Sequence, residues 1–182
     1  MPRKPKVVPS VWRSVFSKVL SMSAITITRV DYANPLHAQA LVDLLDDYAR
    51  DPMGGAHALD AEVKQRLVAE LAARPWAYSV MAWEGGQAVG LVNALEGFST
   101  FAAKPLVNVH DVTVLASHRG QGIAGLMLAE VEAIARARGA CKLTLEILSG
   151  NRSAAKAYER IGFALYALTP EAGTAQFMQK WL

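Results

Sequence analysis

The sequence predicts a single α/β domain in which helices flank a mixed central β-sheet. Segments with apolar residues at helical spacing alternate with short apolar segments typical of strands. A glycine turn joins two of the strands directly, while helices or loops separate the others. The 182 residues, 52% of them hydrophobic, are enough for one sizeable core. We place this domain at residues 23–182.

Residues 1–22 are expected to form a basic, amphipathic N-terminal extension. Its charged residues are all basic, and its apolar residues fall near one face of a possible helix, which could contact a membrane surface, a partner or its own domain. It lacks the long apolar stretch of a membrane-spanning helix or a secretory signal. Met22, just before the first expected strand, would also serve as a start, so a mis-assigned start stays open. The basic residues are Arg3, Lys4, Lys6, Arg13 and Lys18.

The first half of the domain is expected to contain a strand, two helices and a β-hairpin. Pro35 suits the first turn of a helix, and the apolar positions from Ala38 to Tyr48 follow helical spacing. The breaker-rich run 51–55 ends that helix, and Glu84-Gly85-Gly86 marks the hairpin turn. The expected ranges are a strand at 24–30, a helix from Pro35 to before Pro52, a helix at 58–73, and strands at 76–83 and 87–95.

In the second half, strands and helices alternate up to a final pair of strands. Gly139 and Gly162 suit the ends of two helices, because glycine readily adopts the left-handed conformation found there. The expected ranges are a loop at 98–105, a strand at 107–115, a helix from the glycine motif to about 138, a strand at 142–148, a helix at 153–161, and strands at 163–168 and 175–181.

The run Arg119-Gly120-Gln121-Gly122-Ile123-Ala124 indicates an anion-binding site at a helix start. Gly120 and Gly122 lack a β-carbon, so their backbone N–H groups can approach a ligand closely. The helix N-terminus adds unpaired donors and a partial positive charge, and Arg119 adds a cation. The less specific interpretation is a tight strand-to-helix turn with an exposed arginine.

A competing interpretation uses the same glycines. Gly120, Gly122 and Gly125 also fit the G-x-G-x-x-G pattern of dinucleotide-binding folds, and Glu146 lies about twenty residues further on. However, polar residues separate the strand from these glycines, and too few residues follow to complete a doubly wound sheet. An NAD-binding oxidoreductase therefore stays the less favoured alternative.

The run at 151–163, NRSAAKAYERIGF, lies one helix and one strand after the glycine motif. The ordered pair resembles the GNAT acetyltransferase superfamily, in which [Q/R]-x-x-G-x-[G/A] wraps the pyrophosphate of acetyl-CoA and N-x-x-A-x-x-x-Y-x-x-x-G-F follows. The resemblance covers nearly all of 24–182 and implies the GNAT fold, with acetyl-CoA as co-substrate. The cofactor-binding residues that it implies are Val112, Thr113, Val114, Arg119, Gly120, Gln121, Gly122, Ile123, Ala124, Gly125 and Asn151.

In the family, the pantetheine arm lies beside the strand that corresponds to Val112, Thr113 and Val114 and hydrogen-bonds to its backbone like an added strand. Asn151 would contact the cofactor, although asparagine before a helix is also a favoured N-cap.

The resemblance implies that Tyr158 is the general acid. When an amine attacks acetyl-CoA, a thiolate is expelled, and a phenol can protonate or hydrogen-bond that sulfur. The amine must also lose a proton, and Glu146 matches the catalytic glutamate of ribosomal-protein N-terminal acetyltransferases. Asp111 and His110 on the preceding strand are lesser candidates for this base. The alternatives are a packed aromatic at Tyr158 and a structural or solvated carboxylate at Glu146.

The acceptor site is expected between the loop after the first helix and the loop at 98–105. Acidic and aromatic residues there suit a cation with an apolar body. Removing the five positive charges of the extension from a net charge of +3 leaves −2, which gives no support to nucleic-acid binding and is compatible with an amine substrate. The candidates are Tyr48, Asp51, Met53, His57, Glu96, Phe98 and Phe101.

The sequence thus predicts an N-acetyltransferase that moves acetyl from acetyl-CoA to a primary amine by direct attack in a ternary complex. The acceptor would be a small molecule or a protein N-terminus or lysine, with no metal. A catalytically silent CoA-binding sensor or assembly module is the alternative from another class. Cys141 is the single cysteine and is expected to be a small buried hydrophobe, which together with the absence of disulfides favours the cytoplasm. Exposed sheet edges allow a homodimer.

Overall fold

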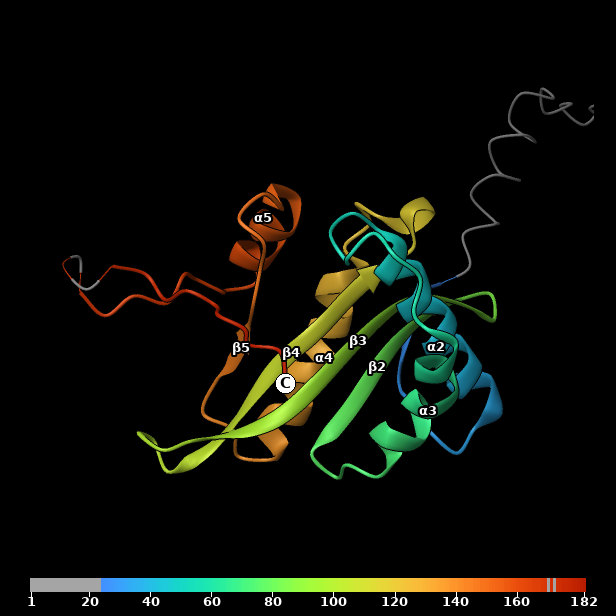
Figure 1. Ribbon diagram of the computed structural model, residues 1–182, viewed down its shortest axis with the longest axis horizontal. Coiled ribbons are helices and arrows are strands. Elements are labelled where there is room, and N and C mark those ends of the chain that lie inside the picture. The colour runs from blue at the N-terminus through green and yellow to red at the C-terminus, as the bar shows by residue number, and fades with distance from the viewer. Residues whose placement is uncertain (1–23, 170, 172) are drawn as a thin grey trace, which may run out of the picture.

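A computed structural model describes residues 24–169, 171 and 173–182. Five strands form one sheet in the order β1-β2-β3-β4-β5, antiparallel except for the parallel pair β4 and β5 (Figure 1). The extension predicted at 1–22 lies outside the described residues. The strands are β1 Thr26–Arg29, β2 Ala77–Glu84, β3 Gln87–Ser99, β4 Lys104–Val114 and β5 Leu143–Leu145. The helices are α2 Pro35–Arg50, α3 Ala61–Ala72, α4 Ile123–Ala137 and α5 Arg152–Arg160, with a 3-10 turn at Ala116–His118.

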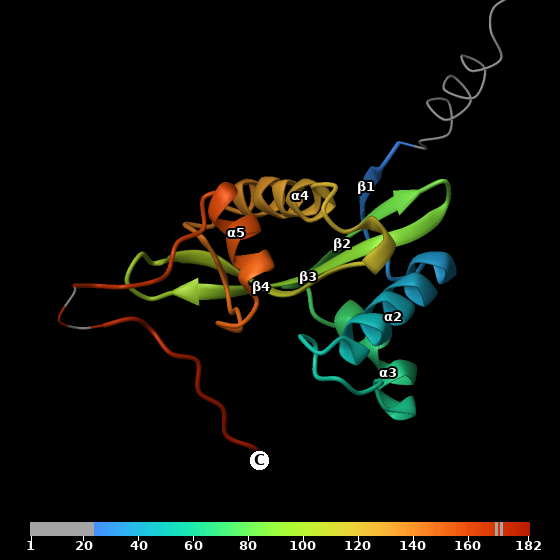
Figure 2. The ribbon, with the colours of Figure 1, turned by 90° about the horizontal axis from the view of Figure 1, so that it is seen from above.

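Helices cover both faces of the sheet, as Figure 2 shows from above. On one face α4 packs against side chains of β2, β3 and β4, in a cluster that includes Val80, Val92 and Met127. On the other face α2 packs with α3 over a second cluster, which includes Leu41 and Leu91. The predicted α/β class, with helices flanking a mixed sheet, is therefore confirmed.

Local sequence signals explain why the first helix and the hairpin form where predicted. Asn34 caps α2, since its side-chain oxygen accepts a hydrogen bond from the Leu36 N–H at 2.9 Å, and Pro35 occupies the first turn. The strands β2 and β3 pair directly across the turn from Glu84 to Gln87. No described helix is long and apolar enough to cross a membrane.

The predicted loop at 98–105 is wrong at both ends. β3 continues to Ser99 and β4 begins at Lys104, with Phe98 paired with Pro105. Only the tip between the two strands turns, because backbone pairing extends the hairpin well beyond the sheet core. The hairpin tip consequently projects at the end of the sheet opposite to the C-terminal end of β4 (Figure 1).

An irregularity in the pairing of β3 with β4 determines which way β4 presents its side chains. Ala94 pairs with Val109, but Asn93 pairs with Asp111, so His110 is an extra residue on β4. Such a β-bulge bends the strand and shifts its alternation. Val107 and Val109 face the α4 cluster, and strict alternation would place Asp111 with them. Instead, Asp111 lies on the α2 face beside Asn93.

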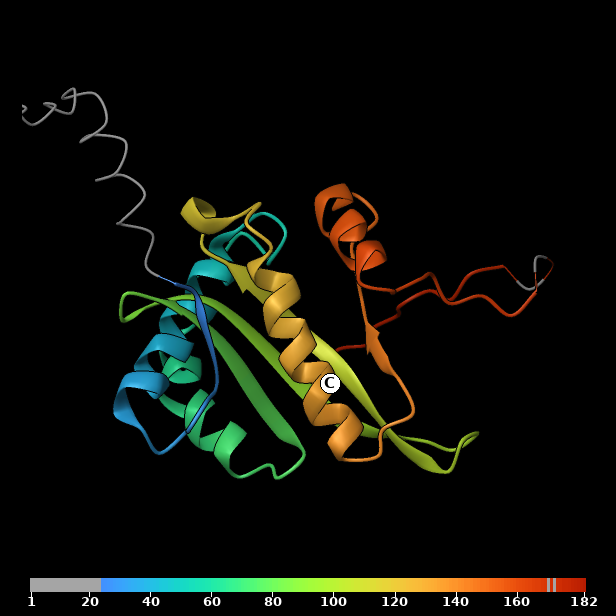
Figure 3. The ribbon, with the colours of Figure 1, turned by 180° about the vertical axis from the view of Figure 1, so that it is seen from behind.

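β5 is shorter than the predicted strand at 142–148. Its pairing with β4 covers only Val107–Val109 against Leu143–Leu145. Beyond these residues the two segments separate, and the chain continues into α5, which stands apart from the sheet (Figure 3).

The two final strands predicted at 163–168 and 175–181 are wrong for the described residues. The only pairing described there is an isolated antiparallel bridge between Ala167 and Thr174. The segment extends away from the sheet instead of pairing with the outer edge of β5 (Figure 2). Without that pairing its large apolar side chains stay exposed; they are Leu165, Tyr166, Leu168, Phe177, Met178, Trp181 and Leu182.

Candidate active site

The start of α4 forms an open seat for an anion. Gly120 and Gly122 have φ of 78° and 80°, and a β-carbon built at either would meet no atom within 4 Å. Gly122 is the N-cap residue, and no side chain in the described part of the chain caps the helix. Free backbone donors, open space and the positive end of the helix dipole are therefore combined at this point.

Other residues of the glycine motif have different environments. Ile123 is buried at 2% exposure, so only its backbone can face a ligand. Gly125 lies against α5, where an added β-carbon would touch Ile161 at 3.9 Å. Gln121 is exposed, and its side-chain amide lies 3.5 Å from the Ser117 carbonyl.

Arg119 is held by two neighbours. Its Nε donates to the Val114 carbonyl at 3.0 Å, and its Nη2 donates to Oδ2 of Asp51 at 2.9 Å. The pKa of Asp51 is lowered by a hydrogen bond from the Met53 N–H and by the bond from Arg119. The cation next to the glycines is thus connected to the loop that follows α2.

Among the described residues, no strand neighbours the edge of β4 beside this seat. Val112, Thr113 and Val114 pair with β3 on one side, while β5 pairs only with Val107–Val109. This leaves backbone groups on the other side available to an extended ligand, while the Val114 carbonyl is bound by Arg119. The Thr113 side chain is buried on the α2 side, and within the described residues its Oγ1 has no hydrogen-bond partner.

Asn151 caps α5. Its Oδ1 accepts from the Ala154 N–H at 3.2 Å, which satisfies a donor at the helix start. The capping role raised in the sequence analysis is therefore real, and any cofactor contact would be additional to it.

Tyr158 projects from α5 against the α4-side core and lies edge-on to Phe163, with ring centroids 5.9 Å apart. Burial raises the pKa of Tyr158 to about 12, and the neighbouring Tyr48 adds to the shift. The phenol therefore keeps its proton over the ordinary pH range. Burial likewise raises the pKa of Tyr48, with the charges of Asp111 and Asp51 adding to it. Tyr48 therefore lies within electrostatic range of both Tyr158 and Asp111.

The two candidate carboxylates differ in their surroundings. Glu146 follows the end of β5, is exposed, and accepts from the Asn108 amide at 3.1 and 3.2 Å. Asp111 is partly buried and accepts from the Asn93 amide at 2.9 Å. His110, the extra residue, is exposed. Asn93 and its partner Ser79 were not among the predicted site residues; the bulge that brings them to Asp111 has no glycine or proline to mark it.

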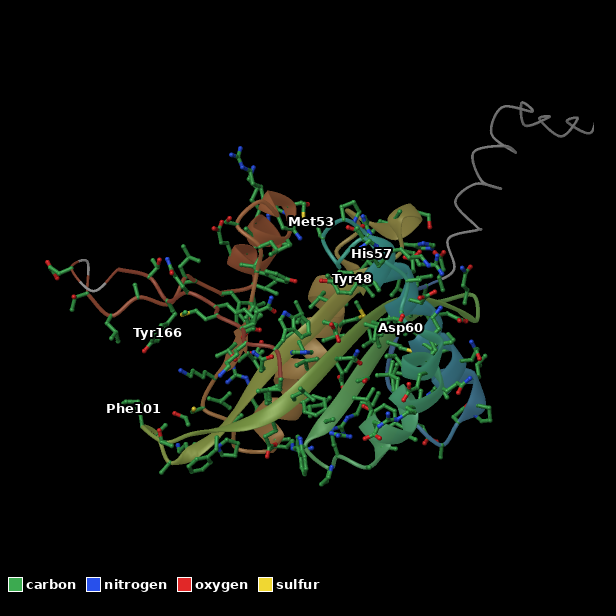
Figure 4. The ribbon with its side chains drawn as sticks, viewed as in Figure 1. Tyr48, Met53, His57, Asp60, Phe101 and Tyr166 are labelled. Atoms are coloured by element: carbon green, nitrogen blue, oxygen red, sulfur yellow. The ribbon has the colours of Figure 1, made fainter. Side chains whose placement is uncertain are left out.

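The two loops expected to form the acceptor site do not meet. Figure 4 shows Tyr48, Met53 and His57 together near the C-terminal end of β4, while Phe101 lies at the distant hairpin tip. Phe98 is at the base of that tip, paired with Pro105. Glu96 is bound to Arg138 next to α4, at 2.6 Å. The continuous hairpin separates these three residues from the others.

The described part of the chain contains no group of three or more His, Cys, Asp and Glu side chains that could hold a metal ion. Cys141 is exposed, so the prediction of a buried cysteine is wrong. The cause is its position in the loop before β5 rather than within a strand.

Comparison with known proteins decides the family. The family described as Acetyltransferase (GNAT) matches residues 38–163, most of the described chain. The chain belongs to the GNAT acetyltransferase family. The match includes the glycine motif and the run from Asn151 to Phe163, so it confirms the resemblance on which the sequence prediction rests.

Individual relatives of this GNAT protein either match only part of the chain or have low sequence identity to it. Streptothricin acetyltransferase of Streptomyces lavendulae is 37% identical over 84 residues, which span 44% of each chain. A solved ribosomal-protein-alanine N-acetyltransferase from Brucella melitensis biovar Abortus 2308 has a TM-score of 0.65 and 22% identity, covering 87% of this chain and 100% of the other. An aminoglycoside N-acetyltransferase in complex with CoA has a TM-score of 0.68 and 19% identity, covering 87% and 95%. At these identities the solved structures establish the GNAT fold.

Proposed function

We propose that this GNAT protein transfers acetyl from acetyl-CoA to a primary amine by direct attack within a ternary complex. The observation that carries the proposal is the juxtaposition of an open anion seat at α4, a β4 edge without a neighbouring strand among the described residues, and a partly buried, protonated Tyr158. Family membership supports acetyl-CoA as the ligand, and an aminoglycoside N-acetyltransferase of the same fold has been solved with CoA.

The residues proposed for the cofactor keep the roles that the sequence suggested. The pyrophosphate would lie on the N–H groups from Gly120 to Gly125, near Arg119. The pantetheine arm would follow the backbone of Val112–Val114, since that edge has no β5 neighbour. Asn151 would contact the cofactor while it caps α5.

Tyr158 would act on the leaving group. Its phenol is neutral because burial raises its pKa to about 12, so it is present as a donor at any assay pH. As the tetrahedral intermediate collapses, the phenol hydrogen-bonds to the departing sulfur and delivers its proton. The phenolate then takes the extra proton from the new amide nitrogen, which restores the enzyme.

The amine needs a second group, because an ammonium cannot attack. Glu146, favoured by the sequence, and Asp111 are the two carboxylates available. We favour Asp111 as the base, because both Asp111 and Tyr158 lie within electrostatic range of Tyr48. Glu146 is exposed, and we give it the role of attracting a cationic acceptor to the site.

The acceptor class proposed is a small cationic amine. Tyr48, Asp51 and Asp111 supply an aromatic ring and two carboxylates near one another, which suits a cation. The name of the Streptomyces relative adds streptothricin as a specific candidate. A protein N-terminus or lysine stays in the test panel. We place the reaction in the cytoplasm, because the lone Cys141 needs no oxidising compartment.

A homodimer is part of the proposal. The outer edges of β1 and β5 have no partner strand among the described residues, so a second copy could pair with one of them. Light scattering on the eluting protein would measure its mass directly, and a monomer at all concentrations would contradict this part.

The first test compares thermal unfolding with acetyl-CoA, CoA, NAD and no ligand, because a ligand that binds only the folded state raises its apparent stability. Stabilisation by acetyl-CoA but not NAD is expected; stabilisation by NAD alone would contradict the proposal and support an oxidoreductase. The second test measures CoA release with streptothricin, an aminoglycoside, lysine, spermidine and a peptide. Acetyl-CoA binding without turnover of any amine would indicate a catalytically silent module.

A further inference from the structure

A row of polar side chains crosses the sheet on the face covered by α2. Ser79, Asn93 and Asp111 are register partners on β2, β3 and β4, and Tyr32 joins the row from the segment after β1. The Tyr32 and Ser79 hydroxyl oxygens lie 2.9 Å apart, the Ser79 hydroxyl and Asn93 Oδ1 lie 2.6 Å apart, and Asn93 Nδ2 and Asp111 Oδ2 lie 2.9 Å apart.

Proton counting fixes the direction of this chain. A serine hydroxyl has one proton, and here it is donated to Asn93 Oδ1. Tyr32 must therefore donate to Ser79. Since Asn93 accepts through Oδ1, its Nδ2 faces Asp111 and can only donate. Every hydrogen bond in the row points toward Asp111.

The centre of the row is buried, since Ser79 and Asn93 are 1% and 5% exposed. With Asp111 as a carboxylate the chain cannot be reversed, because the Asn93 carbonyl oxygen would then face a carboxylate oxygen and neither has a proton to donate. Burial raises the pKa of Tyr32, against a smaller opposite effect of its bond to Ser79. Tyr32 therefore stays protonated and keeps its place as the first donor.

Asp111 uses only one of its oxygens in this row. Within the described residues, the hydrogen bond that Asp111 accepts through its side chain is the one at Oδ2, so Oδ1 stays available to a ligand. The titratable groups around Asp111 are His110 next to it on β4 and Tyr48 of α2, which is also within electrostatic range of Asp51 and Tyr158. Asp111 therefore lies on the side of the sheet where we place the acceptor.

We propose that Tyr32, Ser79 and Asn93 form a one-way hydrogen-bond chain that positions Asp111 to take the proton of the acceptor ammonium. The inference rests on the proposed acetyl transfer and makes Asn93 the positioning residue of the base. The Asn93 N–H occupies Oδ2, so the oxygen that takes the proton is Oδ1. Asp111 accepts one proton from the ammonium, the neutral amine attacks the thioester carbon, and Asp111 later releases that proton to water.

The experiment uses matched asparagine substitutions on the full chain. Asn93→Leu removes the donor to Asp111, and Asn108→Leu removes the equivalent amide that bonds Glu146. Each variant is assayed with the panel amine that the wild type acetylates fastest, over a range of pH. For Asn93→Leu, the acidic limb of the kcat/KM profile is expected to move up by about one pH unit, since a hydrogen bond to a charged group is lost. For Asn108→Leu the limb is expected to stay in place.

Further measurements separate a positioning role from a structural one. Asn93→Leu should bind acetyl-CoA with unchanged Kd, and Tyr32→Phe and Ser79→Ala should move the limb in the same direction by smaller amounts. These two variants also serve if Asn93→Leu does not fold. Asp111→Asn should lower kcat/KM by at least a hundredfold. A limb moved by Asn108→Leu and not by any variant of the row would overturn the inference in favour of Glu146. An inactive wild type would instead refute the proposed function itself.

Discussion

The guanidinium of Arg119 lies 2.9 Å from the carboxylate of Asp51. One partner belongs to the glycine motif and the other to the loop after α2, so the proposed phosphate seat and the acceptor side share an ion pair. Because Asp51 offsets part of the positive charge of Arg119, each side should respond when the other is altered.

Asp51→Asn is therefore expected to strengthen acetyl-CoA binding while it weakens binding of the amine. An exposed ion pair contributes about 1 kcal/mol or less, so the Kd of acetyl-CoA should fall by up to about fivefold. Isothermal titration would measure this Kd. Arg119→Ala is the opposite control and should raise it. An unchanged Kd in both variants would remove Arg119 from the cofactor site.

Gly122→Ala should weaken acetyl-CoA binding by at least tenfold, because the methyl group would occupy the anion seat. The left-handed backbone at this position, with φ of 80°, adds a stability cost of about 1–2 kcal/mol. Gly139→Ala is the matched control: it lies at the other end of α4, with φ of 76° and open space around it. Equal stability losses with an affinity loss only at Gly122 are expected. Equal affinities would contradict this placement of the pyrophosphate.

Asn151→Ala should lose about 1 kcal/mol of stability through its cap and should also bind acetyl-CoA less tightly. Asn34→Ala removes a comparable cap from α2, away from the glycine motif. Chemical denaturation and titration together separate the two effects. If both variants bind acetyl-CoA like the wild type, Asn151 is a cap and nothing more.

Tyr158→Phe should lower kcat by on the order of a hundredfold and leave the Kd of acetyl-CoA within about twofold. The substitution should also change alkaline stability. In the folded protein burial raises the pKa of Tyr158 from 10.0 to about 12, so the wild type loses stability as pH rises between these values, by about 3 kcal/mol for this group. The variant should lack that part of the loss in urea unfolding at pH 9 and pH 12. A wild-type rate in the variant would exclude Tyr158 as the acid.

Asp46→Asn should destabilise the protein except in strong acid. Asp46 accepts from Lys64 of α3 at 2.8 Å and from the Leu59 N–H at 2.8 Å, so it joins the two helices and the loop between them. The hydrogen bond from Lys64 is the largest of several that lower the pKa of Asp46 to about 2. Its stabilisation is present above pH 3.8 and is lost as pH falls toward 2. Melting temperatures against pH would show this, with Asp43→Asn on the same helix as the control.

Elements with local signals were predictable from the sequence. The helix at α2 has a cap, a proline and regular apolar spacing, and the β2–β3 turn has its glycines, so both appear where expected. The final strands had the right composition but needed the edge of β5 as a partner, and composition does not specify that pairing. β5 itself is shorter for the same reason, since its length depends on how far it stays beside β4.

The same distinction between local sequence signals and tertiary pairing applies to the residues of the candidate site. The glycine motif and Tyr158 belong to contiguous patterns, so the sequence could single them out. The bond between Asn93 and Asp111 depends on a register of β3 against β4 that changes at one residue, and neither strand carries a signal for it. Glu146 was favoured over Asp111 because its position matches the catalytic glutamate of ribosomal-protein N-terminal acetyltransferases.

His110 has a consequence for how variation in β4 should be interpreted. His110 is the single residue between the Val109–Ala94 pair and the Asp111–Asn93 pair, because Asn93 and Ala94 are adjacent on β3. Deleting His110 would therefore remove the bulge and leave Asp111, Val112 and Thr113 on their present faces. A strand that kept His110 but paired it with Asn93 would instead turn the carboxylate of Asp111 toward the valine-rich core under α4. The register of β4 against β3, more than the residue type at position 110, determines whether β4 can present a base at all.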